Sequence, residues 1–319
     1  MFHHILVPLD GSVLAECVLP HVVAVARASN AQVTLLQVVE CPHCESAAAP
    51  VDPLHWRMRM AEAQAYLHKL AERLQPTGLS IDTVLLEGQA ASGVVDFLRA
   101  HDIDLIALSS HGEGGMSAWN IGGMVHKIIQ RAHISALIVR AYSPSASCNL
   151  TELHYARILA PVDGSPRADY ALGPAASLAQ CHNARLILAH IVKKTVMFPR
   201  TPAQAEYEEL AERLLAYNRC EAIRYLEKTQ ARLDRDVETR VVVGDDVVEC
   251  LHQLAEAEAI DLVVLNAHGK SGKTKWPFGS VCANMILYGA TPLLIVQDLP
   301  AQQIEPTHAE RYAKERAGH

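Results

Sequence analysis

An acidic residue and a glycine-rich loop suggest a place where a phosphate-bearing ligand could bind. Asp163 follows a short apolar run and stands before Gly164 and Ser165, and the loop 266–280 carries glycines and lysines and leads into a predicted helix. Backbone N–H groups in such a loop and the dipole of the following helix favour phosphate oxygens. The carboxylate could accept hydrogen bonds from an amino group or a ribose, or it could serve only the turn after its strand, with Ser165 near a helix N-cap.

Part of this loop resembles a P-loop. The run from Ala267 to Thr274, Ala-His-Gly-Lys-Ser-Gly-Lys-Thr, matches the Walker A pattern except at its first residue. A true P-loop would place Lys273 on the β- and γ-phosphates and continue directly into a helix. Trp276 and Pro277 stand where that helix should run, and too little chain follows for the later strands of that fold. We therefore do not expect a P-loop.

The pair Cys41-Pro-His-Cys44 could act in redox chemistry or contribute to a zinc site. A loop containing Pro50 and Pro53 separates it from the next predicted helix, and a complete set of zinc ligands cannot be named. We expect Cys41 and Cys44 to be loop thiols that take no part in redox chemistry or zinc binding. The eight cysteines are spread along the chain, unlike those of a small disulfide-stapled secreted domain.

The sequence repeats itself. Residues 5–12 read Ile-Leu-Val-Pro-Leu-Asp-Gly-Ser and residues 158–165 read Ile-Leu-Ala-Pro-Val-Asp-Gly-Ser, an offset of 153. Residues 104–112 match residues 261–269 at an offset of 157, and both segments end in His-Gly. Since the same motifs recur in the same order, the chain contains two homologous domains.

We predict domains at 1–141 and 155–299, joined by a linker at 142–154 and followed by a polar tail at 300–319. In each domain, short β-branched runs alternate with helical patterns, which predicts an α/β fold with a doubly wound, parallel five-stranded sheet in each half. Pro20 should kink the first helix or shift its start. The expected strands are 3–9, 32–39, 80–87, 104–110, 135–140, 157–162, 184–192, 237–243, 261–266 and 292–297. The expected helices are 13–29, 54–75, 91–101, 122–132, 168–181, 202–233, 246–259 and 280–289.

Composition excludes several classes of partner. The 319 residues include 28 Lys and Arg against 35 Asp and Glu, a net charge of −7, and only 5% are aromatic. This balance argues against nucleic acid or an anionic membrane as the main partner. Neither a signal peptide nor a membrane-spanning run is recognisable, so we expect a cytoplasmic protein.

Both halves resemble the universal stress protein family, and the whole chain resembles its tandem members. The family's nucleotide motif is Gly, two residues, Gly, nine residues, Gly, then Ser or Thr. The second half loses only the first glycine, whereas the first half also loses the terminal hydroxyl. The motif positions are Asn266, Gly269, Gly279 and Ser280 in the second half and Ser109, Gly112, Gly122 and Gly123 in the first.

The resemblance implies a Rossmann-like, adenine nucleotide α-hydrolase-like fold and a stress-response sensor or switch. It implies as ligand an adenine nucleotide, ATP or else ADP or AMP, with or without Mg²⁺. Contacts are expected mainly in the second half, at Pro161, Asp163, Ile191, Asn266, Gly269, Lys270, Lys273, Gly279 and Ser280. The weaker equivalents, next to a loop with Glu113 in place of lysines, are Pro8, Asp10, Val38, Gly112, Gly122 and Gly123.

Two other classes of function stay open at this point. One is a slow ATPase or a related nucleotide hydrolase, although neither a Ser-His-Asp order nor paired carboxylates appear in the repeated segments. The other is a protein-interaction module without a ligand. His111 and His268 stand beside the loop glycine of each half and either touch phosphate or hold the loop by geometry alone.

The fifth strand of each half, 136–140 and 293–297, is apolar and terminal by chain order, so it would leave an open sheet edge. The family resemblance implies that these two strands pair antiparallel, so that each half covers the edge of the other. Further association would use other surfaces, and we expect a homodimer of tandem chains.

Overall fold

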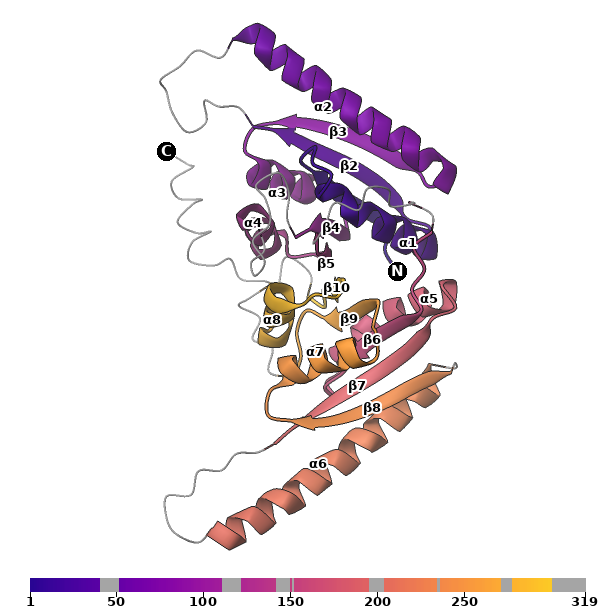
Figure 1. Cartoon of the computed structure of the whole chain (residues 1–319), viewed down its shortest axis with the longest axis vertical. Coiled ribbons are helices and arrows are strands. Elements are labelled where there is room, and N and C mark those ends of the chain that lie inside the picture. Colours follow the sequence, from indigo (N-terminus) through magenta and orange to yellow (C-terminus); the bar gives the residue numbers. More distant parts are fainter. Residues whose placement is uncertain are drawn as a thin grey trace.

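Ten apolar segments of the sequence pair as strands of one sheet, and helices cover both of its faces (Figure 1). The computed structural model describes residues 1–40, 52–110, 122–141, 150, 152–194, 204–233, 236–270 and 277–299. The Cys41–Cys44 pair, Gly112, Glu113, His111, Lys273 and the tail from 300 lie outside these residues. No helix in the described part is both long enough and apolar enough to cross a membrane.

Every predicted strand and helix is present, and the ends are shifted by no more than about two residues, which is ordinary for element boundaries, except at the starts of α1 and α5, which lie six and four residues later than expected. The strands are β1 His4–Leu9, β2 Gln32–Val39, β3 Ile81–Glu87, β4 Leu105–Ser109, β5 Ser135–Val139, β6 Arg157–Pro161, β7 Arg185–Lys193, β8 Val237–Gly244, β9 Leu262–Asn266 and β10 Leu293–Val296. The helices are α1 Leu19–Ser29, α2 Pro53–Leu74, α3 Ala90–Ala100, α4 Gly123–Ala132, α5 Leu172–Cys181, α6 Gln204–Arg232, α7 Val247–Ala257 and α8 Ser280–Tyr288.

The first helix of each half starts late. A single 3-10 turn, Ala15–Val18 or Ala168–Ala171, precedes α1 or α5. In α1, Pro20 lies in the first turn, where its missing N–H leaves no helical hydrogen bond unmade. The proline therefore shifts the start of the helix and does not kink it.

The strand order is β3-β2-β1-β4-β5-β10-β9-β6-β7-β8. Within each half the neighbouring strands are parallel, as the apolar runs predicted, whereas β5 and β10 pair antiparallel with Leu137 opposite Leu294. The two predicted five-stranded sheets are therefore halves of one ten-stranded sheet. In Figure 1 this pairing lies at the middle of the molecule, and α2 and α6 lie at its two ends.

Alternate side chains of the strands enter two hydrophobic cores. Ile5 and Val7 of β1 face the core that includes α1, α2, α5 and α6, whereas Leu6 faces the core that includes α3, α4, α7 and α8. Because both faces are covered, the strands are nearly continuous apolar runs without polar alternation. This arrangement leaves the carboxyl ends of the strands available for a site.

Polar contacts reinforce the seam between the halves. Arg140, just after β5, donates to the carbonyl oxygens of Ile286, Leu287 and Gly289 at 2.6–2.7 Å, so a residue of the first half caps the C-terminus of α8. A cation near a helix C-terminus also interacts favourably with the helix dipole.

A second seam contact joins α1 to Tyr155, two residues before β6. His21 Nδ1 lies 2.8 Å from the hydroxyl of Tyr155, a fully buried side chain. Burial lowers the pKa of His21 to about 4 from an ordinary value of 6.5. The imidazole is therefore neutral in the folded protein at neutral pH, and its protonation opposes folding.

We expect stability to fall on acidification through this histidine. Below pH 6.5 the unfolded chain binds a proton at His21 that the folded chain does not bind until about pH 4. The contribution to the free energy of unfolding is therefore lost as pH falls through this window, up to about 3 kcal/mol in all. Chemical denaturation at several pH values should show a shallower acid decline for His21→Gln than for the wild type. His68→Gln, on the exposed surface of α2, is the control, and parallel curves for wild type and His21→Gln would contradict the assignment.

We also expect the first half alone to associate. Residues 1–145 expressed without the second half would expose the outer edge of β5, whose backbone groups pair with β10 in the full chain. Light scattering should then find dimers or aggregates, whereas the full chain has this edge covered. A clean, soluble monomer at tens of micromolar would be incompatible with an edge that needs a partner strand.

Candidate functional site

A cavity of about 550 Å³ lies in the second half at the carboxyl ends of β6, β7 and β9. Its size falls within the range of small-molecule sites, and its place is where open α/β sheets bind ligands. The cavity also borders α7 and the N-terminus of α8. Its lining is Pro161, Val162, Asp163, Ala168, Ala189, Ile191, Val247, Leu251, Leu265, Asn266, Ala267, His268, Gly269, Lys270, Phe278, Gly279, Ser280, Val281 and Cys282.

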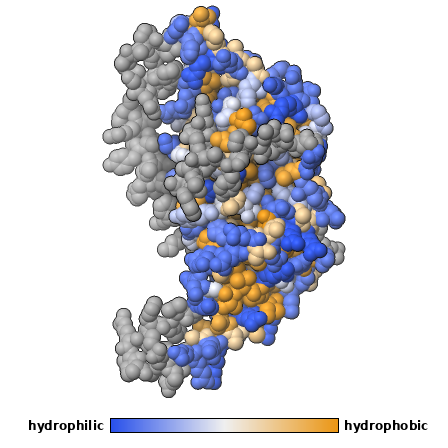
Figure 2. Space-filling view, viewed as in Figure 1, coloured by the Kyte–Doolittle hydropathy of each residue, from blue (hydrophilic) through white to orange (hydrophobic). Residues whose placement is uncertain are grey.

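One side of the cavity is apolar. Pro161 is the last residue of β6, and Ile191 lies near the end of β7. Val247 and Leu251 of α7 line the cavity with them. Figure 2 shows a hydrophobic area on the lower half of the molecule, in the region of α7 and β8. The apolar residues of the cavity lining can bury a flat, uncharged group, but they cannot fix its orientation without polar neighbours.

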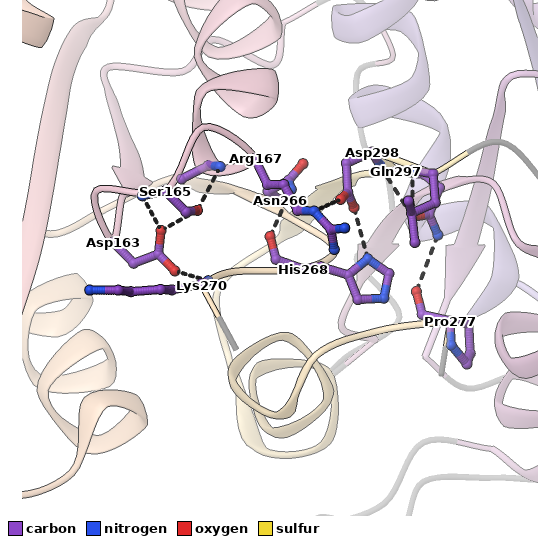
Figure 3. A network of polar contacts seen from close by, with 11 residues as sticks. Asp163, Ser165, Arg167, Asn266, His268, Lys270, Pro277, Gln297 and Asp298 are labelled. Atoms are coloured by element: carbon purple, nitrogen blue, oxygen red, sulfur yellow. Dashed lines mark hydrogen bonds and ion pairs between the residues drawn. The ribbon is translucent and has the colours of Figure 1, made fainter. Parts of the chain in front are cut away.

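Asp163 supplies the one carboxylate among the described residues that line the cavity. Its Oδ1 accepts hydrogen bonds from the Ser165 N–H at 3.0 Å and the Ser165 hydroxyl at 2.6 Å, and its Oδ2 accepts from the Lys270 N–H at 2.5 Å (Figure 3). Burial by itself would raise the pKa of Asp163, but these hydrogen bonds and nearby His190 hold it below its usual value. The carboxyl is therefore ionised at neutral pH.

Two glycines allow this arrangement. Gly164 has φ of +78°, a left-handed conformation that lets the chain turn directly after Asp163. At Gly269, a Cβ atom would overlap Asp163 Oδ2, so only glycine brings the Lys270 N–H within reach of the carboxylate. The loop after β9 is thus tied to the turn after β6.

The N-terminus of α8 faces the same cavity. Gly279 is its N-cap and makes no side-chain cap hydrogen bond, and the Gly279 N–H donates to Ala267 O at 2.7 Å. The N–H groups of the first turn, beginning at Ser280, have no carbonyl of their own helix to bind. With exposed Lys270 beside them, they form a positive surface that suits an anion.

Asn266 and His268 hold the loop from inside. Asn266, at the end of β9, is buried, and its Nδ2 donates to His268 O at 2.8 Å. Its Oδ1 is buried with no hydrogen-bond partner among the described residues. His268 is also buried, and its Nδ1 lies 2.8 Å from Asp298 Oδ1. Of the two roles left open for His268, this geometry favours holding the loop.

Eight of the nine second-half residues predicted from the sequence line this one cavity, and Lys273 lies outside the described residues. The walls supplied by Val247, Leu251 and Phe278 were not predicted from the sequence. The apolar positions of α7 look the same in sequence whether they face a core or a cavity, so no signal separated them.

The first half builds the equivalent turn. Asp10 Oδ1 accepts from the Ser12 N–H at 2.9 Å, and Gly11 has φ of +86°. The Gly122 N–H donates to Ser110 O at 2.9 Å, as Gly279 does to Ala267 O, and α4 begins at Gly123. Pro8 and Val38 lie near the ends of β1 and β2. The loop with Gly112 is outside the described residues, so a first-half site stays a prediction.

The chain is similar in sequence to known universal stress proteins. A universal stress protein of Mycobacterium tuberculosis, Rv2005c, is 24% identical over 306 residues, 92% of this chain and 96% of that protein. The universal stress protein MJ0531 of Methanocaldococcus jannaschii is 27% identical over 141 residues, 44% of this chain and 83% of that protein.

Solved structures show the same fold. A universal stress protein from Archaeoglobus fulgidus superposes with a TM-score of 0.64 and 16% identity, covering 92% of this chain and 98% of that chain. The protein PA1789 of Pseudomonas aeruginosa, described as functionally unknown, gives a TM-score of 0.66 and 15% identity with 98% of each chain covered.

The family model for the universal stress protein family matches the chain twice, at residues 1–140 and 154–297. Each match covers one of the repeated halves that the structure joins through β5 and β10. The chain therefore belongs to the universal stress protein family, with two family domains in tandem.

Proposed function

We propose that the second-half cavity binds an adenine nucleotide, ATP in the first place, and that the protein acts as a nucleotide-dependent sensor or switch in a stress response. The observation that carries the proposal is the combination in one cavity of an apolar side, an ionised carboxylate and a helix N-terminus with a lysine beside it. A cytoplasmic location and a homodimer of tandem chains belong to the same proposal, as expectations from the sequence.

The apolar side and Asp163 suit a nucleoside. Pro161, Ile191 and Val247 offer walls for a base. A carboxylate has roughly four acceptor positions, and the hydrogen bonds from Ser165 and Lys270 use three at Asp163. The position left over can accept from a ribose hydroxyl or an exocyclic amino group, which gives the apolar pocket its polar specificity.

The opposite side suits phosphates. Gly279 has φ of −70°, and a Cβ there would lie 3.4 Å from Ala267 O. The protein's own structure therefore does not demand glycine at 279 as it does at 269. A glycine that the fold does not need is consistent with close approach of a ligand to the backbone. The Ser280 hydroxyl and the Lys270 ammonium add one donor and one positive charge.

Binding, and not turnover, is the activity that the described lining favours. Asp163 is the one carboxylate among the described lining residues, and three hydrogen bonds already hold it. The His268 imidazole is engaged with Asp298. In this proposal the acceptor position left at Asp163 binds the nucleoside, and the His268 side chain is 0% exposed, so neither group is placed to take a proton from a water that attacks a phosphate. Separation of ADP and AMP after incubation with ATP measures this directly.

We expect one tight nucleotide site in each chain. Gly279→Val combined with Ser280→Ala should abolish it, because a branched side chain at 279 blocks the approach to the α8 N-terminus and the hydroxyl is lost. Calorimetric titration with ATP gives stoichiometry and affinity. The matched control is Gly122→Val in the first half, where a Cβ meets Ser110 O at the same 3.4 Å. Two equal sites in the wild type would contradict the asymmetry.

We expect Lys270→Glu to weaken ATP far more than adenosine, because only the phosphates meet the charge of this side chain. The lost charge-assisted contact should cost on the order of 1–3 kcal/mol, or about tenfold or more in ATP affinity. Lys228→Glu makes the same charge change on the exposed surface of α6 and should leave both affinities unchanged. Equal losses for the two ligands would place Lys270 outside the phosphate-binding part.

A further inference from the structure

We infer that Gln297 and Asp298, the two residues that follow β10, are positioning residues of the second-half site. Neither lines the cavity, yet their side chains hold three segments that surround it: the turn after β6, the loop after β9 and the residues before α8 (Figure 3). The influence of these residues on nucleotide affinity rests on the function proposed above, whereas their role in holding the loops in place does not.

Gln297 fixes the start of α8. Its Nε2 donates to Pro277 O at 3.1 Å, two residues before the N-cap Gly279. Its Oε1 accepts from the N–H groups of Asp298 at 3.2 Å and Leu299 at 3.3 Å, so both ends of the amide are used. The entry to the helix N-terminus is thereby tied to the end of a central strand.

Asp298 fixes the other two segments. Its Oδ1 lies 2.8 Å from His268 Nδ1, and its Oδ2 lies 3.6 Å from Arg167 Nε. The side chains of Asp298 and His268 are 1% and 0% exposed. A carboxylate so far from water is stable only with its partners in place, which makes the contact a strong constraint on them. His268 directly precedes Gly269, and Arg167 stands two residues after Ser165.

The pair is anchored to the first half of the chain. The Gln297 N–H donates to Ser135 Oγ at 3.1 Å, and Ser135 is the first residue of β5. This bond continues the antiparallel pairing of β5 with β10. A residue of the first half therefore supports the network that reaches the second-half loops.

The described residues of the first half do not repeat this arrangement of side chains. At the repeat offset of 157, Arg140 corresponds to Gln297 and Ala141 corresponds to Asp298. Alanine has no side-chain acceptor, and Arg140 reaches across the seam to the last turn of α8. The two halves thus differ in what holds their loops, which is a structural cause for unequal sites.

The segments that Gln297 and Asp298 hold are those that carry the candidate phosphate donors, near Gly269 and Gly279. Of the apolar walls, Ile191 stands on β7 and Val247 and Leu251 stand on α7, apart from these segments, whereas Phe278 follows Pro277 directly. Loosening the network, and the Gln297 contact with Pro277 in particular, should therefore weaken recognition of phosphates far more than recognition of the nucleoside. A general loss of folding would weaken both.

The test uses the full chain, with ATP and adenosine as calorimetric probes. We expect Gln297→Ala to raise the Kd for ATP about tenfold and the Kd for adenosine by no more than about twofold, as the loss of one positioning hydrogen bond suggests. Asp298→Asn, which keeps an oxygen for His268 but loses the charge, should act in the same direction and less strongly. The control, Gln253→Ala, removes an exposed amide of α7 bonded to Glu249 and should change neither affinity. Equal losses of ATP and adenosine binding, or an unchanged ATP affinity, would overturn the inference.

Amide hydrogen exchange in ligand-free protein separates this inference from the proposed function. Exchange at 268–270 and 279–282 should be faster in Gln297→Ala and Asp298→Asn than in the wild type, with α7 unchanged. If the wild type binds neither probe, the nucleotide proposal fails, and faster exchange still supports the positioning role. Unchanged exchange in both variants overturns that role whether or not nucleotide binds. Ser135→Ala, a milder change at the seam, provides a third variant should Gln297→Ala fail to fold.

Discussion

The antiparallel pairing of β5 with β10 is the contact on which the rest of the structure depends. Each family domain ends its sheet with a short, fully buried strand whose outer backbone groups need partners. Because each half supplies the missing partner of the other, both edges are satisfied inside one chain. The seam then brings Arg140 to the end of α8, His21 to Tyr155 and Ser135 to Gln297.

Much of the repeated structure is preserved through contacts that both halves make in the same way. The Asp-Gly-Ser turn has the same hydrogen bond and the same left-handed glycine in both halves. In each half an ion pair also joins the long helix to the 3-10 turn before the first helix. Arg73 of α2 pairs with Glu16 at 2.7 Å, and Arg232 of α6 pairs with Asp169 at 2.8 Å. These contacts stabilise the same arrangement of turns and helices in both halves and involve no ligand. They therefore do not distinguish one half from the other.

The halves diverge where the chain leaves its last strand. A glutamine and an aspartate hold the second-half loops, whereas the corresponding arginine and alanine serve the seam and the packing around it. Among the described residues, the second half thus surrounds a cavity, and Ser135 of the first half supports the network beside it. Placing the support at the β5–β10 seam joins assembly of the two halves to the geometry of the candidate site.

The elements, the duplication and most of the cavity's polar lining could be predicted from the amino-acid sequence. Apolar runs, the proline in α1, the Asp-Gly-Ser turns and the glycine spacing are local patterns, and each has a local physical reason that operates before the chain folds. The family resemblance added the antiparallel seam and the residues that meet at the cavity. Eight of them do lie together, whereas Lys273 and a first-half site stay predictions.

Which apolar helix face borders the cavity and which acid supports its loops could not be predicted, because both depend on tertiary packing. Leu251 reads as a core residue, and Asp298 reads as a surface acid after the final strand. The crossover connections and the strand order bring Leu251 beside Ile191 and Asp298 beside His268, across long separations in sequence. Such contacts depend on the packing of whole elements and not on local preference, so no pattern near either residue could reveal them.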